Sequence, residues 1–178
     1  MHPRDWNRIL LGLVLTTPSA YVAHAEVYLS ENQAAEIFFP GVKLEDRWME
    51  LTPPEMKLIN KNSGERVSSS RVRLWRGPGR EVMFIDRVLG KHEFITYAVA
   101  LLPEGKIKGV EILEYRETYG YEIREAHWRQ KFTGKTLRDP LKVTQDIPNI
   151  SGATLSSVHV TNGVRRILHT YEILKDKI

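Results

Sequence analysis

Hydrophobic residues in the middle of the chain cluster in segments that have the length and composition of β-strands. Three segments of strand length, 81–89, 93–102 and 106–116, are rich in β-branched and aromatic residues. Short connections with turn-forming Gly and Pro residues separate them, so the segments are predicted to form an antiparallel meander. In 106–116 apolar and polar residues alternate at first, and Gly109 interrupts the alternation as a β-bulge would. One face of this strand is therefore expected to face solvent.

Two helix-start signals precede the meander. Ser30 and Thr52 each stand three residues before Gln33 and Glu55 respectively, which is the capping-box pattern. Apolar residues follow both boxes, so a short helix is predicted after each. Between the second helix and the meander, residues 72–75 indicate a further strand that ends at a Gly-Pro-Gly turn.

Helical periodicity returns after the meander. Residues 124–132 carry a short helical pattern, with Gly134 as its expected terminator. Residues 154–175 form the longest helical stretch, and its apolar positions share one face that is expected to pack across the sheet. These positions are Val164, Ile167, Leu168, Tyr171 and Leu174. The order of elements predicts an α+β fold, in which an antiparallel sheet packs with a long C-terminal helix and short N-terminal helices.

The N-terminus has the features of a secretory signal peptide. Arg4 and Arg8 provide positive charge, residues 9–15 form an apolar run, and Ala23-His24-Ala25 is an A-x-A cleavage site. The apolar run is much shorter than the roughly 20 residues of a membrane span. We therefore expect cleavage after Ala25, a single domain over 26–178, and a periplasmic or extracellular location.

The composition is that of an ordinary globular protein and excludes several chemistries. Of 178 residues, 42% are hydrophobic and 27% charged, and the formal net charge is +4. The lack of cysteine excludes disulfides, zinc–cysteine sites and a cysteine nucleophile. The small positive surplus does not indicate a nucleic-acid partner. Because the sequence also lacks i, i+4 histidine pairs and the GxSxG and GxGxxG motifs, we expect neither a metal site, a serine hydrolase nor direct nicotinamide binding.

The segment entering the last predicted helix is the strongest candidate for chemistry. Unpaired backbone N–H groups and the helix dipole favour an anion at such a point. Gly152 permits close approach of a ligand, Ala153 has only a small side chain, and Thr154 places a hydroxyl at the N-terminus of the predicted helix. These properties suit a phosphate ester. The alternative is an ordinary N-cap, made by the hydroxyl of Ser151 or Thr154.

The string Ser-Gly-Ala-Thr at 151–154 resembles the flavinylation motif of the FMN-binding domain family, which includes the C subunit of the sodium-translocating NADH:quinone reductase and the G subunit of the Rnf complex. The family pattern is Asp, two residues, Ser or Thr, then Gly-Ala-Thr and a helix. The resemblance implies that Thr154 carries FMN through a phosphoester. It also implies a cofactor-binding role for the neighbouring residues Ser151, Gly152, Ala153, Leu155 and Ser156. At the Asp position this chain has Pro148, and the nearest carboxylate is that of Asp146.

A second stretch, 117–135, is similar to an upstream motif of the same family, Glu-Thr-Pro-Gly-Leu-Gly followed by Trp and Phe-x-Gly-Lys. Glu117, Thr118 and Gly120 agree with it, whereas Tyr119, Tyr121 and Glu122 replace the Pro, the Leu and the second Gly. The resemblance implies that the cofactor is also bound by Glu117, Thr118, Tyr119, Gly120 and Trp128. Aromatic side chains in this stretch offer faces for an isoalloxazine ring, although a core or surface aromatic cluster would have the same composition.

These features predict an exported flavoprotein that carries FMN on Thr154, receives it from a flavin transferase, and relays electrons between redox partner proteins, membrane-bound ones included. The main alternative is a noncovalent FMN-binding or protein-docking module of the same fold. A third possibility is a flavin reductase or a subunit of a larger oxidoreductase. An electron-transfer role fits better than a stand-alone enzyme, and no catalytic acid or base is expected.

Two smaller features have open interpretations. An arginine cluster is either a solvated sheet edge or a docking surface for an acidic redox partner. Its members are Arg71, Arg73, Arg76 and Arg80. Gly163 lies inside the last helix, where Gly is unfavourable. Close approach of the sheet or the flavin would explain it, and so would simple tolerance.

Overall fold

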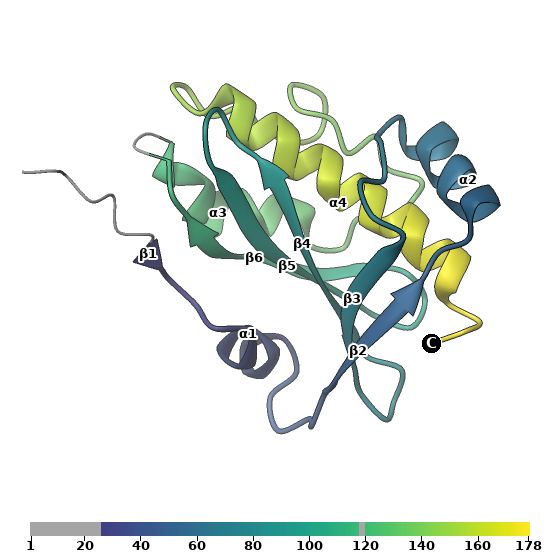
Figure 1. Cartoon of the computed structure of the whole chain (residues 1–178). Coiled ribbons are helices and arrows are strands. Elements are labelled where there is room, and N and C mark those ends of the chain that lie inside the picture. The colour runs from purple at the N-terminus through teal and green to yellow at the C-terminus, as the bar shows by residue number, and fades with distance from the viewer. Residues whose placement is uncertain (1–25, 118–119) are drawn as a thin grey trace, which may run out of the picture.

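A six-stranded antiparallel sheet lies between a long helix, α4, and a short helix, α1 (Figure 1). The computed structural model describes residues 26–117 and 120–178. The strand order is β1-β6-β5-β4-β3-β2. The strands are β1 Glu26–Val27, β2 Glu45–Glu50, β3 Arg71–Arg76, β4 Val82–Leu89, β5 Phe94–Leu101 and β6 Ile107–Tyr115. The helices are α1 Glu31–Phe38, α2 Pro53–Ser63, α3 Ala126–Arg129 and α4 Thr154–Leu174, with 3₁₀ turns η1 Tyr121–Arg124 and η2 Gln130–Phe132.

Both predicted capping boxes are present. The Ser30 hydroxyl accepts from the Gln33 N–H at 3.2 Å, and the Gln33 side chain accepts in return from the Ser30 N–H at 2.8 Å. Thr52 and Glu55 make the same reciprocal pair at the start of α2. Gly64, in the left-handed region at φ 72°, ends α2. Local polar patterns thus fixed where these two helices begin.

The predicted meander is confirmed as β4, β5 and β6, and the bulge falls where expected. Ala100 pairs with Gly109 while Leu101 pairs with Ile107, so β6 contains an extra residue here. A Cβ on Gly109 would lie 2.7 Å from the ring of Phe38. Glycine at the bulge therefore also lets α1 pack directly on the sheet.

The expectation of a solvent-facing side to this sheet is corrected by the structure. A second core cluster joins α1 to the sheet face opposite α4. Its buried members are Ala34, Ala35, Phe38, Phe39, Leu44, Met83, Ala98, Ala100 and Leu113. Lys106 and Lys108, near the start of β6, are exposed as expected, and Glu111 is partly exposed. The sheet is covered on both faces because the N-terminal helix folds back under it.

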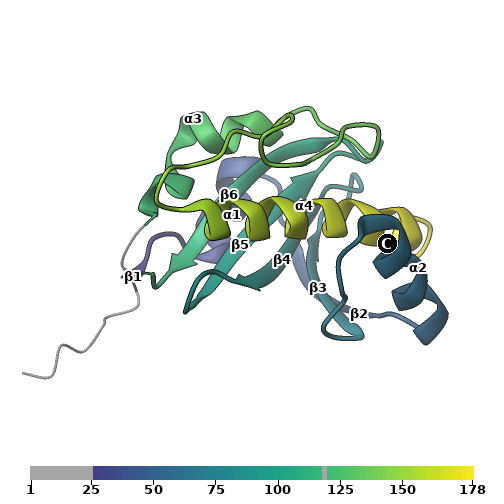
Figure 2. The ribbon, with the colours of Figure 1, turned by 90° about the horizontal axis from the view of Figure 1, so that it is seen from above.

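Helix α4 crosses the other face of the sheet, with α2 beside its C-terminal half (Figure 2). All five apolar positions predicted to face the sheet are buried. Gly163 is explained by the sheet, because a Cβ there would collide with the Tyr97 hydroxyl. That hydroxyl donates to Asp86 at 2.7 Å, and Arg166 of α4 donates to the same carboxylate oxygen at 2.6 Å. Sheet and helix are thus joined by a polar network within the core.

Two segments differ from the predictions. Residues 124–132 do not form one helix, because Glu125 is extended at φ −67° and ψ 133° and separates η1 from α3, which continues directly into η2. Strand β2 was not predicted, since its sequence EDRWME is mostly exposed at the sheet edge and lacks apolar alternation. Within the described ranges, no helix is long and apolar enough to cross a membrane.

Candidate functional site

Helix α4 begins at Thr154 with Ala153 at the N-cap and no side-chain capping hydrogen bond. The alternative of an ordinary Ser or Thr N-cap is therefore excluded by the geometry. Gly152 precedes the cap in the left-handed region, at φ 81°, which glycine adopts readily. A helix of 21 residues thus presents its first-turn N–H groups and positive dipole end without a side-chain cap from the described part of the chain, an arrangement that attracts an anion.

A cavity of about 480 Å³ opens beside this helix terminus, within the size range of small-molecule sites. It is lined by Lys91, His92, Glu117, Gly152, Ala153, Thr154, Leu155 and Ser156. The lining residues come from the β4–β5 turn, the end of β6 and the first turn of α4. Folding therefore brings Glu117 of the upstream motif to the same hollow as the residues around Thr154.

The Thr154 side chain is exposed at this cavity and is oriented by Asn149. The Asn149 amide donates to Thr154 Oγ1 at 3.2 Å, while its carbonyl oxygen accepts from the Ser157 hydroxyl at 3.1 Å. This hydrogen bond uses a lone pair of the Thr154 oxygen, so the hydroxyl proton is left for another acceptor. Sequence reasoning did not place Asn149 in the site, although its position just before the Ser-Gly-Ala-Thr string was the available signal.

The two motifs touch at Gly120 and Ala153. Gly120 has φ +87°, and a Cβ on it would lie 2.5 Å from the Ala153 Cβ and 2.7 Å from the Tyr115 hydroxyl. Small side chains at both positions are thus required for this contact. The Tyr115 hydroxyl lies 3.4 Å from the Ser156 hydroxyl, and burial raises the pKa of Tyr115, so the phenol stays neutral at neutral pH.

Glu117 holds the β4–β5 turn against the cavity. Its carboxylate accepts from the backbone N–H groups of His92 at 2.6 Å and Glu93 at 3.1 Å. Burial acts to raise the pKa of Glu117, but these backbone hydrogen bonds outweigh it and leave the pKa below its ordinary value. A Cβ on Gly90 would lie 2.5 Å from the same carboxylate. Glu117 therefore fixes the turn that brings Lys91 and His92 to the cavity.

The remaining predicted residues fall into three groups. Trp128 is buried and does not line the cavity; its indole N–H donates to the Pro148 carbonyl at 2.9 Å and so holds the loop before Ser151. Ser151 is exposed on that loop, outside the described cavity lining. Thr118 and Tyr119 lie outside the described residues. Lys91 and His92 line the cavity but were not predicted, because their short turn only indicated a strand connection.

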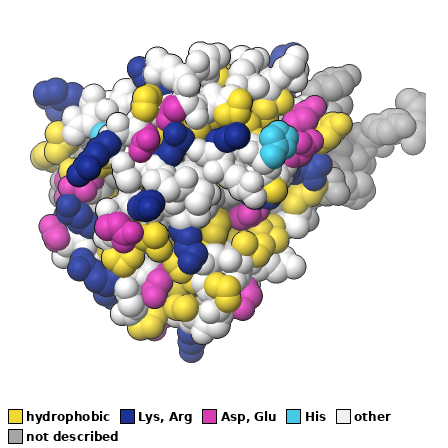
Figure 3. Space-filling view, turned by 180° about the vertical axis from the view of Figure 1, so that it is seen from behind, with side chains coloured by type: hydrophobic (Ala, Val, Ile, Leu, Met, Phe, Trp, Pro, Cys, Tyr) yellow, Lys and Arg dark blue, Asp and Glu magenta, His cyan; other side chains and the backbone are white. Residues whose placement is uncertain are grey.

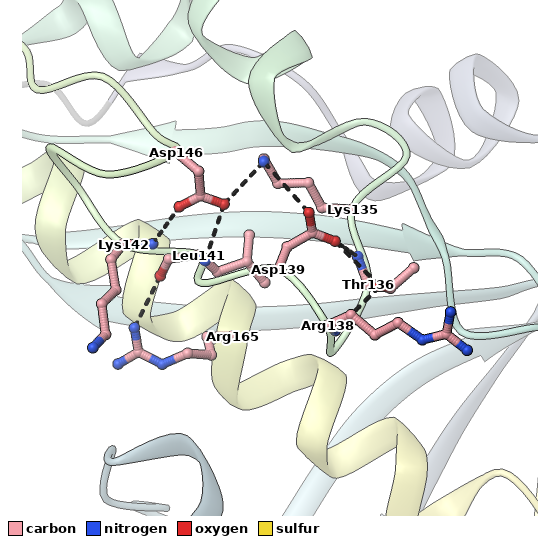
Figure 4. Close-up of polar contacts among 8 residues, drawn as sticks. All are labelled: Lys135, Thr136, Arg138, Asp139, Leu141, Lys142, Asp146 and Arg165. Atoms are coloured by element: carbon pink, nitrogen blue, oxygen red, sulfur yellow. Dashed lines mark hydrogen bonds and ion pairs between the residues drawn. The ribbon is translucent and has the colours of Figure 1, made fainter.

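Asp146 does not take the place of the carboxylate that Pro148 lacks (Figure 4). Its oxygens accept from the N–H groups of Leu141 at 3.1 Å and Lys142 at 2.9 Å, and it pairs with Lys135 at 2.9 Å. Burial would raise the pKa of Asp146, but these partners lower it. The carboxylate thus stabilises its own loop.

A helix terminus beside a cavity of this size is suited to a phosphate-bearing cofactor. Residues 90–169 match the family model of the FMN-binding domain. This range contains every described residue that lines the cavity. The match confirms the family resemblance and identifies this part of the chain as an FMN-binding domain, with FMN as its cofactor.

One relative is similar to this chain in sequence, and one solved structure is similar to it in fold. The G subunit of the Na⁺-translocating ferredoxin:NAD⁺ oxidoreductase complex of Acetobacterium woodii is 31% identical over an 80-residue alignment, which covers 40% of this chain and 39% of the relative. The match therefore spans about two fifths of that relative's length. The crystal structure of Shewanella oneidensis NqrC superposes with a TM-score of 0.56 and 18% identity, over 83% of this chain and 88% of NqrC. NqrC thus shares the fold.

Proposed function

We propose that this protein is an exported flavoprotein that carries FMN as a phosphoester on Thr154 and relays electrons between redox partner proteins. One observation carries the proposal. The exposed Thr154 hydroxyl lies in the 480 Å³ cavity, at an α4 N-terminus without a side-chain cap, where the two family motifs meet. A phosphate esterified there would accept hydrogen bonds from the first turn of the helix.

In the attachment step, a flavin transferase would supply an activated flavin phosphate. The Thr154 Oγ–phosphorus bond forms, the bond from phosphorus to its leaving group breaks, and the hydroxyl proton is lost. Relative to the unmodified chain, the product carries FMN less one water. The hydrogen bond from Asn149 leaves the Thr154 proton accessible to an acceptor, which suits Thr154 as the attacking group.

The bound FMN would supply the redox chemistry, and the protein would hold and shield it. Glu117 fixes the β4–β5 turn on one side of the cavity, and the Gly120–Ala153 contact fixes the other. The similarity to a component of a ferredoxin:NAD⁺ oxidoreductase complex supports an electron relay between proteins. Reversible bleaching of bound flavin by a chemical reductant and its recovery with an oxidant test this role, and a purified protein without flavin would contradict it.

Export is proposed from the N-terminal sequence. A signal peptide over 1–25 would direct the chain to the periplasm or cell exterior, and covalent attachment suits a compartment where a lost cofactor cannot be recaptured. The mature protein would then begin at Glu26, the first residue of β1. N-terminal sequencing of the secreted protein tests this: a start at Glu26 supports export with cleavage, and an intact N-terminus in the cytoplasm contradicts it.

A noncovalent FMN-binding module is the second candidate, favoured by one observation. Pro148 occupies the place of the family Asp, and the oxygens of Asp146 are engaged by Leu141, Lys142 and Lys135. If the transferase needs that carboxylate, the cavity would hold FMN without the ester bond. Flavin that leaves the protein on denaturation would distinguish this candidate from the covalent carrier.

A further inference from the structure

A second cavity, of about 410 Å³, lies at the edge of the sheet and plays no part in the proposed electron relay. It is lined by Lys43, Glu45, Arg47, Arg76, Gly77 and Pro78. On the face of the molecule in Figure 3, basic and acidic side chains are interspersed over the described surface. In the edge cavity, three cationic side chains and one carboxylate line the same hollow.

The register of β2 and β3 explains why these charges converge. Glu45 is directly opposite Arg76 in the antiparallel pair, so their side chains share one face of the sheet. Arg47, two residues along β2, lies on the same face. The convergence is therefore built into the strand pairing.

The positive charge in this cavity is only partly balanced. Arg47 pairs with Glu45 at 2.7 Å, and that hydrogen bond, with the charges of Lys43 and Arg76 adding to it, lowers the pKa of Glu45. The nearby Glu81 carboxylate accepts instead from the Gly79 N–H at 2.8 Å. The three lining cations outnumber the carboxylates of Glu45 and of Glu81, which lies beside Gly77, so a positive excess remains that favours an anion.

Arg76 has an unsatisfied side-chain donor. Its Nε is buried from solvent and has no hydrogen-bond partner among the residues that the structure describes. Leaving such a donor without an acceptor is unfavourable. Because Nε is closed to solvent, a bound anion would contact the terminal N–H groups of the same guanidinium, which bind phosphate and carboxylate oxygens in a bidentate manner.

We propose that the cavity between β2 and the β3–β4 turn binds a phosphate-class anion, with Arg76 as the principal donor and Arg47 and Lys43 as charge partners. The cavity and the FMN site lie at opposite ends of β4, which at eight residues is roughly 26 Å long. An anion here therefore does not compete with FMN. The ligand is either a soluble phosphate or the phosphate of an anionic lipid headgroup, which would leave the FMN end directed away from the membrane.

Binding of a phosphate group is common to both ligands. It is tested by calorimetric titration of the FMN-loaded mature protein with inorganic phosphate at constant ionic strength. Loading with FMN occupies the α4 terminus, so the remaining binding reports the edge cavity. We expect Arg76→Gln to weaken phosphate binding about tenfold or more, and Lys43→Gln to weaken it less. Arg87→Gln, at an exposed arginine over Phe94, is the matched control and should have no effect. Equal phosphate binding by wild type and both cavity variants, or no binding by wild type to either phosphate or vesicles, overturns the proposal.

Vesicle flotation distinguishes the two sources. Binding to phosphatidylglycerol vesicles but not to phosphatidylcholine vesicles, lost in Arg76→Gln and retained in Arg87→Gln, identifies a lipid headgroup. Phosphate binding without flotation identifies a soluble anion. If the edge cavity binds lipid phosphate, the chain without FMN should bind the vesicles as the FMN-loaded chain does. The flotation test therefore stays valid even if the FMN proposal fails.

Discussion

Gly120 and Ala153 are in contact where the two motifs meet. Because this contact is tight, adding a single methyl group there is expected to disturb the site. Gly120→Ala would place a methyl group 2.5 Å from the Ala153 Cβ on a backbone at φ +87°, which L-residues rarely adopt. We expect a loss of about 1–3 kcal/mol in the free energy of unfolding, together with reduced FMN content. Denaturant unfolding and flavin absorbance measure the two effects. Gly41→Ala is the control, since its φ is +72° but nothing lies within 4 Å. An equal effect in both variants would mean that backbone strain alone, rather than the Ala153 contact, is responsible.

Glu117 makes the stability of the cavity depend on pH. Because its folded-state pKa lies below the ordinary value of 4.5, the carboxylate stabilises the fold at neutral pH, and that contribution is lost as pH falls below about 4.5. Glu117→Gln should lower stability at pH 7 and reduce the slope of unfolding free energy against pH in the acid range. Asp146 also has a lowered pKa, so some slope remains. Identical slopes for wild type and variant would contradict this role.

At the residue scale, the sequence predicted the residues around Thr154 but missed other residues of the candidate site. Gly152, Ala153 and Thr154 were predicted from a local string at a helix start, and they line the cavity. Lys91 and Asn149 were missed, because the first reaches the cavity only through a turn held by Glu117 from another strand. Which side chains contact FMN stays a prediction.

At the element scale, the packing of α4 on the sheet depends on Gly163. A methyl group there would collide with the Tyr97 hydroxyl and lie 3.1 Å from Val88, so Gly163→Ala should destabilise the protein by about 1–3 kcal/mol despite the better helix propensity of Ala. The loss should be smaller in a Tyr97→Phe background, which removes the colliding oxygen. A double-mutant cycle from denaturant unfolding measures the difference, and strict additivity would exclude this contact as the cause.

Elements with strong local signals were predicted, and those defined by tertiary contacts were not. The capping boxes at Ser30 and Thr52 act within four residues, so α1 and α2 could be placed from the sequence. Strand β2 is polar and exists because it pairs with β3 at the sheet edge. The covering of the second sheet face by α1 likewise depends on Gly109, which admits Phe38 across a long sequence separation.

At the scale of the whole molecule, the two proposed sites lie at opposite ends of β4. The cavity proposed to hold FMN lies at the β4–β5 turn, and the cationic cavity lies at the β3–β4 turn at the other end of β4. An electron carrier needs its cofactor accessible to partners, and an anchoring site at the far end would preserve that access. The class of fold and the family could be predicted from the sequence, whereas the cationic cavity depends on strand register and emerged only with the structure.

The intact mass of the secreted protein, produced together with a flavin transferase and measured under denaturing conditions, tests the central claim most directly. We expect wild type and Thr133→Ala, a deletion of an exposed hydroxyl outside the Ser-Gly-Ala-Thr string, to carry the mass of FMN less one water. Thr154→Ala should have the unmodified mass. Wild-type protein without the added mass, or Thr154→Ala protein that retains it, would contradict covalent attachment at Thr154.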